Sequence, residues 1–275
     1  MKMFFEMFSY DFMVRAIVVG LLISLCSSLL GVTMVLKRFS MIGDGLSHVG
    51  FAALAAAAAA GVAPLKVAIP VCIVAAFLIL RISNNTKIKG DQIIAIVCSG
   101  ALAVGIMIVS LSKGMNTDVN NYMFGSVLAL SKEDTVMCII LSAIVLITFF
   151  FFFNKIFSVT FDENFAKATG VRANVYNGII AVLTALTVVI GMKMMGALLI
   201  SSLIIFPCLS SMRVCKKYKS VALLSAIIAV ICFMIGISLS YIKSTPAGAS
   251  VVCSNLVVFL FLSLISFLKK NKKTN

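Results

Sequence analysis

The residues best suited to chemistry are Asp44 and the only histidine of the chain, His48, which lie four positions apart. Residues four apart share one face of an α-helix, so the carboxylate and the imidazole should point the same way, with Ser47 beside them. These ligand types suit zinc and, with less preference, manganese or iron. The alternative is a buried Asp–His hydrogen bond that fixes a pair of helices. The pair stands at the entrance to a long apolar run, where burying ionisable groups is costly, and this favours a transient stop for a divalent cation.

The number of ligands limits this site, because two are too few for a metal and the chain has no second histidine. A two-fold dimer would bring two copies each of Asp44 and His48 to one axis, enough for four-coordination. The sequence therefore predicts a second copy of the chain as a partner, and weak metal binding by one copy alone.

The composition is that of a polytopic α-helical membrane protein. Hydrophobic residues make up 62% of the chain and the mean hydropathy is +1.17, well outside the range of soluble domains. About nine spans of roughly 20 residues would use nearly all 275 residues. We therefore expect one transmembrane domain over residues 1–275, and any ATPase must be a separate chain. The net charge of +14 does not indicate nucleic acid, because the basic residues sit in loops between apolar runs.

Nine spans are expected, with eight to ten possible. Their approximate ranges are 14–36, 40–60, 65–80, 92–111, 136–153, 175–190, 195–212, 221–241 and 249–268. With the N-terminus outside, most of the 23 lysines and arginines fall inside and the C-terminus is cytoplasmic. Segment 122–130 is too short to span the membrane and is expected to be re-entrant. If it does cross, the excess of basic residues on the inner side is lost, because the connection after the fifth predicted span would move outside.

A short helix is predicted on the inner side, in the stretch 160–171. Thr160 and Glu163 have capping-box spacing, and Gly170 is a natural helix stop. An apolar face follows from the helical spacing of Phe161, Phe165 and Ala168. This face suits a groove on a cytoplasmic partner, and the alternative is a helix lying on the lipid surface.

Several catalytic motifs are absent from the sequence. There is no P-loop pattern, so the chain should not bind ATP in that way and should not be an enzyme by itself. With one histidine there is no H-E-x-x-H zinc site either. The eight cysteines show no C-x-x-C spacing and are interpreted as packing residues. A membrane-embedded zinc enzyme is disfavoured, whereas a secondary transporter that works alone stays open.

The chain resembles the membrane permease subunits of bacterial ABC importers for zinc, manganese or iron. The resemblance runs essentially end to end and rests on five motifs in order, at residues 43–48 (GDGLSH), 121–128 (NYMFGSVL), 161–171 (FDENFAKATGV), 196–207 (GALLISSLIIFP) and 245–248 (TPAG). The first and last motifs together resemble the zinc branch. In manganese permeases a Pro-Gly more often stands where this chain has Ala52 and Ala53.

The resemblance implies a multi-pass subunit of the bacterial plasma membrane, in a homodimeric or heterodimeric pore. It implies two partner ATPase subunits, an extracytoplasmic metal-binding protein, and transported Zn²⁺, with Mn²⁺ or Fe²⁺ as alternatives and no cofactor. Asp44 and His48 carry over as pore ligands. The stretch 160–171 should include the coupling helix that contacts the ATPase, and its candidate residues are Thr160, Phe161, Asp162, Glu163, Phe165, Ala168 and Gly170.

Overall fold

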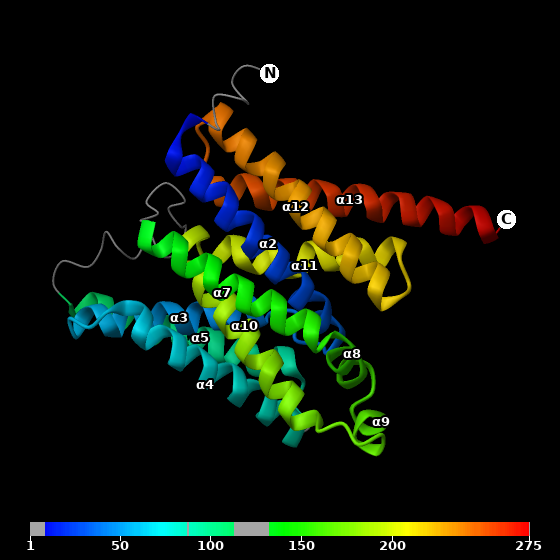
Figure 1. The fold of residues 1–275 in the computed structure, drawn as a ribbon, viewed down its shortest axis with the longest axis horizontal. Helices are drawn as coiled ribbons and strands as arrows, with labels where there is room; N and C mark the ends of the chain where they lie inside the picture. The colour runs from blue at the N-terminus through cyan, green and yellow to red at the C-terminus, as the bar shows by residue number, and fades with distance from the viewer. Residues whose placement is uncertain (1–8, 87, 113–131, 275) are drawn as a thin grey trace.

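The computed structural model describes residues 9–86, 88–112 and 132–274, and all regular structure in these ranges is helical (Figure 1). The helices are α2 (Asp11–Leu36), α3 (Ile42–Ala59), α4 (Pro64–Asn85), α5 (Gly90–Leu111), α7 (Lys132–Phe151), α8 (Phe153–Phe161), α9 (Glu163–Ala168), α10 (Ala173–Met195), α11 (Ala197–Val214), α12 (Tyr218–Lys243) and α13 (Ala247–Thr274).

The predicted all-α membrane fold is confirmed. Within the described ranges, 8 helices are long and apolar enough to cross a membrane, or up to 9 if the bent pair α7–α8 counts as one span. The predicted re-entrant segment 122–130 lies outside the described residues, and the orientation of the termini stays a prediction. In Figure 1, α9 and the C-terminal end of α13 both lie toward the right-hand side of the bundle.

Two helix breaks differ from the predicted span boundaries. The span expected over 136–153 bends by 69° between α7 and α8, and α8 then continues to Phe161, beyond the predicted end of the span. The next expected boundary, before residue 195, is also displaced. The chain turns at Gly196, whose φ of 87° is in the left-handed region that favours glycine, so Met195 ends α10 and does not begin α11.

Close helix packing around α3 explains the glycines of the first motif. A Cβ atom built on Gly43 would lie 2.7 Å from Ile204 Cδ1 of α11, and one on Gly45 would lie 2.6 Å from Ile94 Cγ2 of α5. These distances are too short for a real side chain, so the glycines allow α3 to approach two neighbours at once. The helix that carries Asp44 and His48 is therefore held firmly from its first turn.

Aromatic packing positions α8 at the right-hand end of the bundle in Figure 1. The rings of Phe153 and Phe157 lie 5.3 and 5.0 Å from the ring of Tyr218 at the start of α12. The Tyr218 hydroxyl in turn shares a 3.0 Å hydrogen bond with Thr33 of α2. Because such aromatic pairs bury large areas in a defined geometry, α8 is fixed to α12 and α2, and it presents α9 at the end of the bundle (Figure 1).

Candidate metal centre

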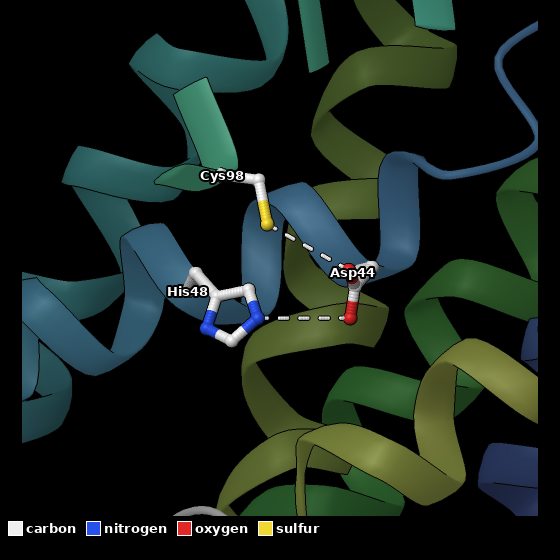
Figure 2. A group of neighbouring side chains, drawn as sticks. All are labelled: Asp44, His48 and Cys98. Carbon is white, nitrogen blue, oxygen red and sulfur yellow. Dashed lines mark hydrogen bonds and ion pairs between the residues drawn. The ribbon is translucent and has the colours of Figure 1, made fainter. Parts of the chain in front are cut away.

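Asp44, His48 and Cys98 come together where α3 packs against α5 (Figure 2). One ligand atom from each of the three side chains can be chosen so that all lie within 4.8 Å of one another. Asp44 and His48 point the same way from successive turns of α3, as the spacing predicted. The third donor, the sulfur of Cys98, comes from α5.

The distances within the cluster exceed those of ordinary hydrogen bonds between nitrogen and oxygen. His48 Nε2 is 3.7 Å from Asp44 Oδ1, so the alternative of a buried Asp–His hydrogen bond is not what the structure shows. Cys98 Sγ is 3.6 Å from Asp44 Oδ2 and donates a weak hydrogen bond to it. In a tetrahedral zinc site with bonds of about 2.0–2.3 Å, neighbouring donors are about 3.3–3.8 Å apart. The two distances to the Asp44 carboxylate are close to this spacing, and one donor atom from each of the three side chains lies within 4.8 Å of the others.

The surroundings keep the donors partly accessible. The side chains of Asp44 and His48 are 35% and 16% exposed, and Cys98 is also only partly buried. Ser47, by contrast, is fully buried and donates a 2.8 Å hydrogen bond to the Asp44 carbonyl oxygen. Its hydroxyl is thus used within the helix, and the cluster consists of three side chains.

Sequence reasoning treated Cys98 as a packing residue. It lies 54 positions from Asp44, and no local spacing links the two residues. The connection is made by Gly45, because the close contact of Gly45 with Ile94 places the next turn of α5, with Cys98, beside Asp44.

The predicted short helix exists as α9, and the side of the membrane on which it lies stays a prediction. The predicted N-cap, Thr160, is wrong. Thr160 belongs to the last turn of α8 and donates a hydrogen bond to the Ile156 carbonyl oxygen at 2.6 Å. The cap is Asp162, whose Oδ1 accepts a 2.9 Å hydrogen bond from the Phe165 amide. The reason is that aromatic packing extends α8 through Phe161, so Thr160 is already inside a helix.

The other candidate coupling residues lie around α9. Phe161 and Phe165 are 59% and 62% exposed, and Ala168 is exposed as well. Gly170 follows the helix with a φ of 81°, the left-handed conformation expected for a helix stop. The end of the bundle thus presents Phe165 on the short, capped helix α9 and Phe161 at the end of α8. The prediction that Phe161 shares one helical face with Phe165 and Ala168 is wrong, because the backbone is extended at Asp162 between the two helices.

A polar network ties α9 to the bundle. Glu163 forms a 2.8 Å ion pair with Lys167 and accepts a 3.1 Å hydrogen bond from Asn177 Nδ2 of α10. Lys37, directly after α2, donates a hydrogen bond to Asn177 Oδ1. Asn177 therefore bridges a cation and a carboxylate at the junction of three elements.

The electrostatics of this network follow from burial and pairing. Burial lowers the pKa of Lys37, an effect that the Glu163 charge opposes and the Lys167 charge reinforces. Burial alone would raise the pKa of Glu163, but hydrogen bonds from Lys167 and Asn177, with the charges of Lys167 and Lys37, lower it overall. Both shifts reflect partly desolvated charges held in one cluster.

Two sequence relatives are membrane subunits of metal uptake systems, to judge by their names. The chain is 29% identical to the high-affinity zinc uptake system membrane protein ZnuB of Haemophilus influenzae over 96% of its own length and 99% of that protein. It is 28% identical to the manganese import system permease protein ScaB of Streptococcus gordonii, over 96% of each chain.

A solved structure and a family match complete the comparison. The fold is similar to a chain of PsaBC from Streptococcus pneumoniae in complex with Fab, with a TM-score of 0.83, 27% identity, and coverage of 95% of this chain and 94% of that one. The model of the ABC 3 transport family matches residues 9–266. The chain therefore belongs to the ABC 3 transport family, and its resemblance to the permease subunits of metal-ion ABC importers is confirmed.

Proposed function

We propose that the chain is the permease subunit of a zinc importer, and that the ion passes Asp44 and His48 on its way across the membrane. The chain is a multi-pass membrane protein without an ATPase of its own, so ATP hydrolysis is the task of a partner subunit. The permease would alternate between two access states that the ATPase drives, with the metal path between them. It would do so as a single transmembrane domain.

The observation that carries this proposal is the convergence of a carboxylate and an imidazole, 3.7 Å apart and partly accessible, in a membrane permease. Ionisable groups in membrane spans mark ion pathways by default, because their burial is otherwise costly. An open coordination sphere also suits transport, since an ion held by a complete cage would leave too slowly.

Zinc is preferred over manganese on the chemistry of these donors. Imidazole nitrogen suits zinc, whereas manganese favours carboxylate, carbonyl and water oxygen. The first and last sequence motifs also resemble the zinc branch. The relatives named for zinc uptake and for manganese import are about equally similar to this chain. Manganese is therefore the second candidate, and a transport measurement must decide between the two metals.

Three partners follow from the proposal. An ABC ATPase would bind around α9, where Phe165 of α9 and Phe161 at the end of α8 are exposed and would enter a groove. An extracytoplasmic metal-binding protein would deliver the ion to the opposite side. A second copy of the chain would complete the pore, and the two copies would present their Asp44–His48 pairs to one path.

Uptake in proteoliposomes tests the metal path. The chain is reconstituted with and without the ATPase of the same importer, and ATP-dependent uptake of radioactive zinc is measured for the wild type, Asp44→Ala and His48→Ala. We expect uptake only with the ATPase and a loss of at least about tenfold in each variant. Uptake by the chain alone would show a secondary transporter, and unchanged variants would refute the site.

Docking of the ATPase is tested separately with Phe165→Asp. A buried charge without a partner should prevent the apolar face from entering a groove, so co-purification of the ATPase should be lost. Asn164→Asp adds the same charge to an adjacent exposed position of α9 and serves as the matched control. Retained association of the Phe165 variant would mean that α9 lies on lipid instead.

A further inference from the structure

We propose that the thiolate of Cys98 is a third ligand of the transported ion, and that it gives the path its preference for zinc-like, soft cations over manganese. This inference rests on the proposed function of Asp44 and His48 and adds the specificity of that same site. Its ligand set is one oxygen, one nitrogen and one sulfur donor from a single copy of the chain.

The geometry assigns this role to one cysteine among eight. Figure 2 shows the Cys98 sulfur turned toward the Asp44 carboxylate, at 3.6 Å from Oδ2. Among the described residues, no other group of three metal-binding side chains is found, and no other cysteine belongs to one. Cys72, also packed against α3, instead donates to the Leu46 backbone carbonyl at 3.6 Å. Only Cys98 combines proximity to both ligands with partial exposure.

The chemistry of sulfur then decides between cations. Thiolate is a soft ligand that binds zinc at about 2.3 Å and is avoided by manganese, which takes hard oxygen donors. A thiol must release its proton to bind the ion, and the open side of the cluster allows the proton to leave to water. A hydroxyl in the same place would bind zinc less well without favouring it over manganese.

Three donors also leave one tetrahedral position free. A water molecule, or a group of the second copy, would fill it as in open zinc sites. One copy of the chain would then bind an ion without the full set of four donors from a dimer. The sequence alone, with two ligands in each copy, predicted that a single copy would bind poorly, so metal binding by one copy distinguishes the two schemes.

Cobalt binding tests the ligand directly. Co²⁺ takes the place of Zn²⁺ and absorbs in the near ultraviolet only when a thiolate is bound. The purified permease–ATPase complex should show this band, Cys98→Ser should lose it, and the control Cys72→Ser should retain it. A band that survives Cys98→Ser would overturn the assignment of the sulfur.

Transport tests the specificity. Zinc and manganese uptake are measured in the same proteoliposomes, with Cd²⁺, a soft cation, as a competitor. We expect the zinc-to-manganese ratio to fall by at least about tenfold in Cys98→Ser, and inhibition by cadmium to weaken in parallel. Cys98→Asp, which supplies a hard oxygen, should lower the ratio further.

The outcomes separate this inference from the proposed function. If Asp44→Ala abolishes uptake while Cys98→Ser leaves the ratio and the cadmium inhibition unchanged, the specificity role of Cys98 is refuted and the path stands. If Asp44→Ala transports normally, the path itself is refuted, whatever Cys98→Ser does. An unfolded Cys98→Ser variant would be recognised by lost ATPase association, and Cys98→Ala would then take its place in both assays.

Discussion

Replacing Asn177 by leucine should detach α9 from the bundle. Asn177 is 7% exposed and forms two hydrogen bonds to charged groups, one from Lys37 and one to Glu163. Such bonds contribute about 1.5–3 kcal/mol each. Because Glu163 is partly exposed and therefore screened, we expect the loss for both together to be about 2–4 kcal/mol. The apolar anchor of α9 is small, since Ala166 is its one buried residue and packs with Val159 and Ala173.

Hydrogen exchange of the permease in lipid nanodiscs measures this loss. Since about 1.4 kcal/mol corresponds to a factor of ten, amide protection in α9 should fall by more than about tenfold while the centres of α2 and α10 stay protected. Asn174→Leu makes the same change one turn earlier on α10, at an exposed position, and should have no effect. Equal protection of α9 in the wild type and Asn177→Leu would refute the reasoning.

A double variant tests whether Lys37 is the source of the penalty. Removing Asn177 leaves the half-buried Lys37 cation without its acceptor, whereas replacing both partners by apolar groups removes the unpaired charge. Lys37→Met with Asn177→Leu should therefore recover part of the protection lost in Asn177→Leu alone. Strictly additive losses would show that the two side chains act independently.

Two further predictions concern the packing of α3 and the charge of α9. Gly45→Ala should destabilise the protein by about 1–3 kcal/mol in thermal unfolding, because its Cβ would lie 2.6 Å from Ile94 Cγ2. The same substitution should weaken the cobalt–thiolate band. The control Gly100→Ala on α5, where a Cβ has nothing within 4 Å, should show no loss of stability. Since the pKa of Glu163 is lowered in the docked state, its stabilisation of α9 is complete above the ordinary value of 4.5 and is lost as the pH falls through the lowered value. Protection of the α9 amides, measured relative to the intrinsic exchange rate at each pH, should therefore fall on acidification in the wild type and much less in Glu163→Gln. Identical pH profiles of protection would contradict this role.

The sequence was most informative where the signal is local. Asp44 and His48 were found because four-residue spacing is a property of one helix, and the helix exists whatever its neighbours are. The break between the predicted spans 40–60 and 65–80 was found for the same reason, since Gly61 has a φ of 67° and Pro64 begins α4. Apolar length gave the spans, because the bilayer fixes how long they must be.

Tertiary packing decided what the sequence could not. Thr160 and Asp162 both offer a side-chain oxygen that can cap a helix, and the choice between them depended on how far α8 continued. The aromatic contacts of Phe153 and Phe157 with Tyr218 extend α8. The sequence near Thr160 does not predict these contacts, because Tyr218 lies far away along the chain. Cys98 was missed for a related reason, because its partner lies on another helix.

The division of the three donors between two helices has a consequence for release of the ion. Asp44 and His48 belong to one helix, so a rigid movement of α3 cannot part them. Cys98 belongs to α5, and any separation of α3 from α5 withdraws the sulfur from the other two donors. Zinc would then pass from three protein ligands to two and bind more weakly. A small separation of the two helices at the close contact between Gly45 and Ile94 would thus lower the affinity for zinc. Asp44 and His48 would keep their positions relative to each other.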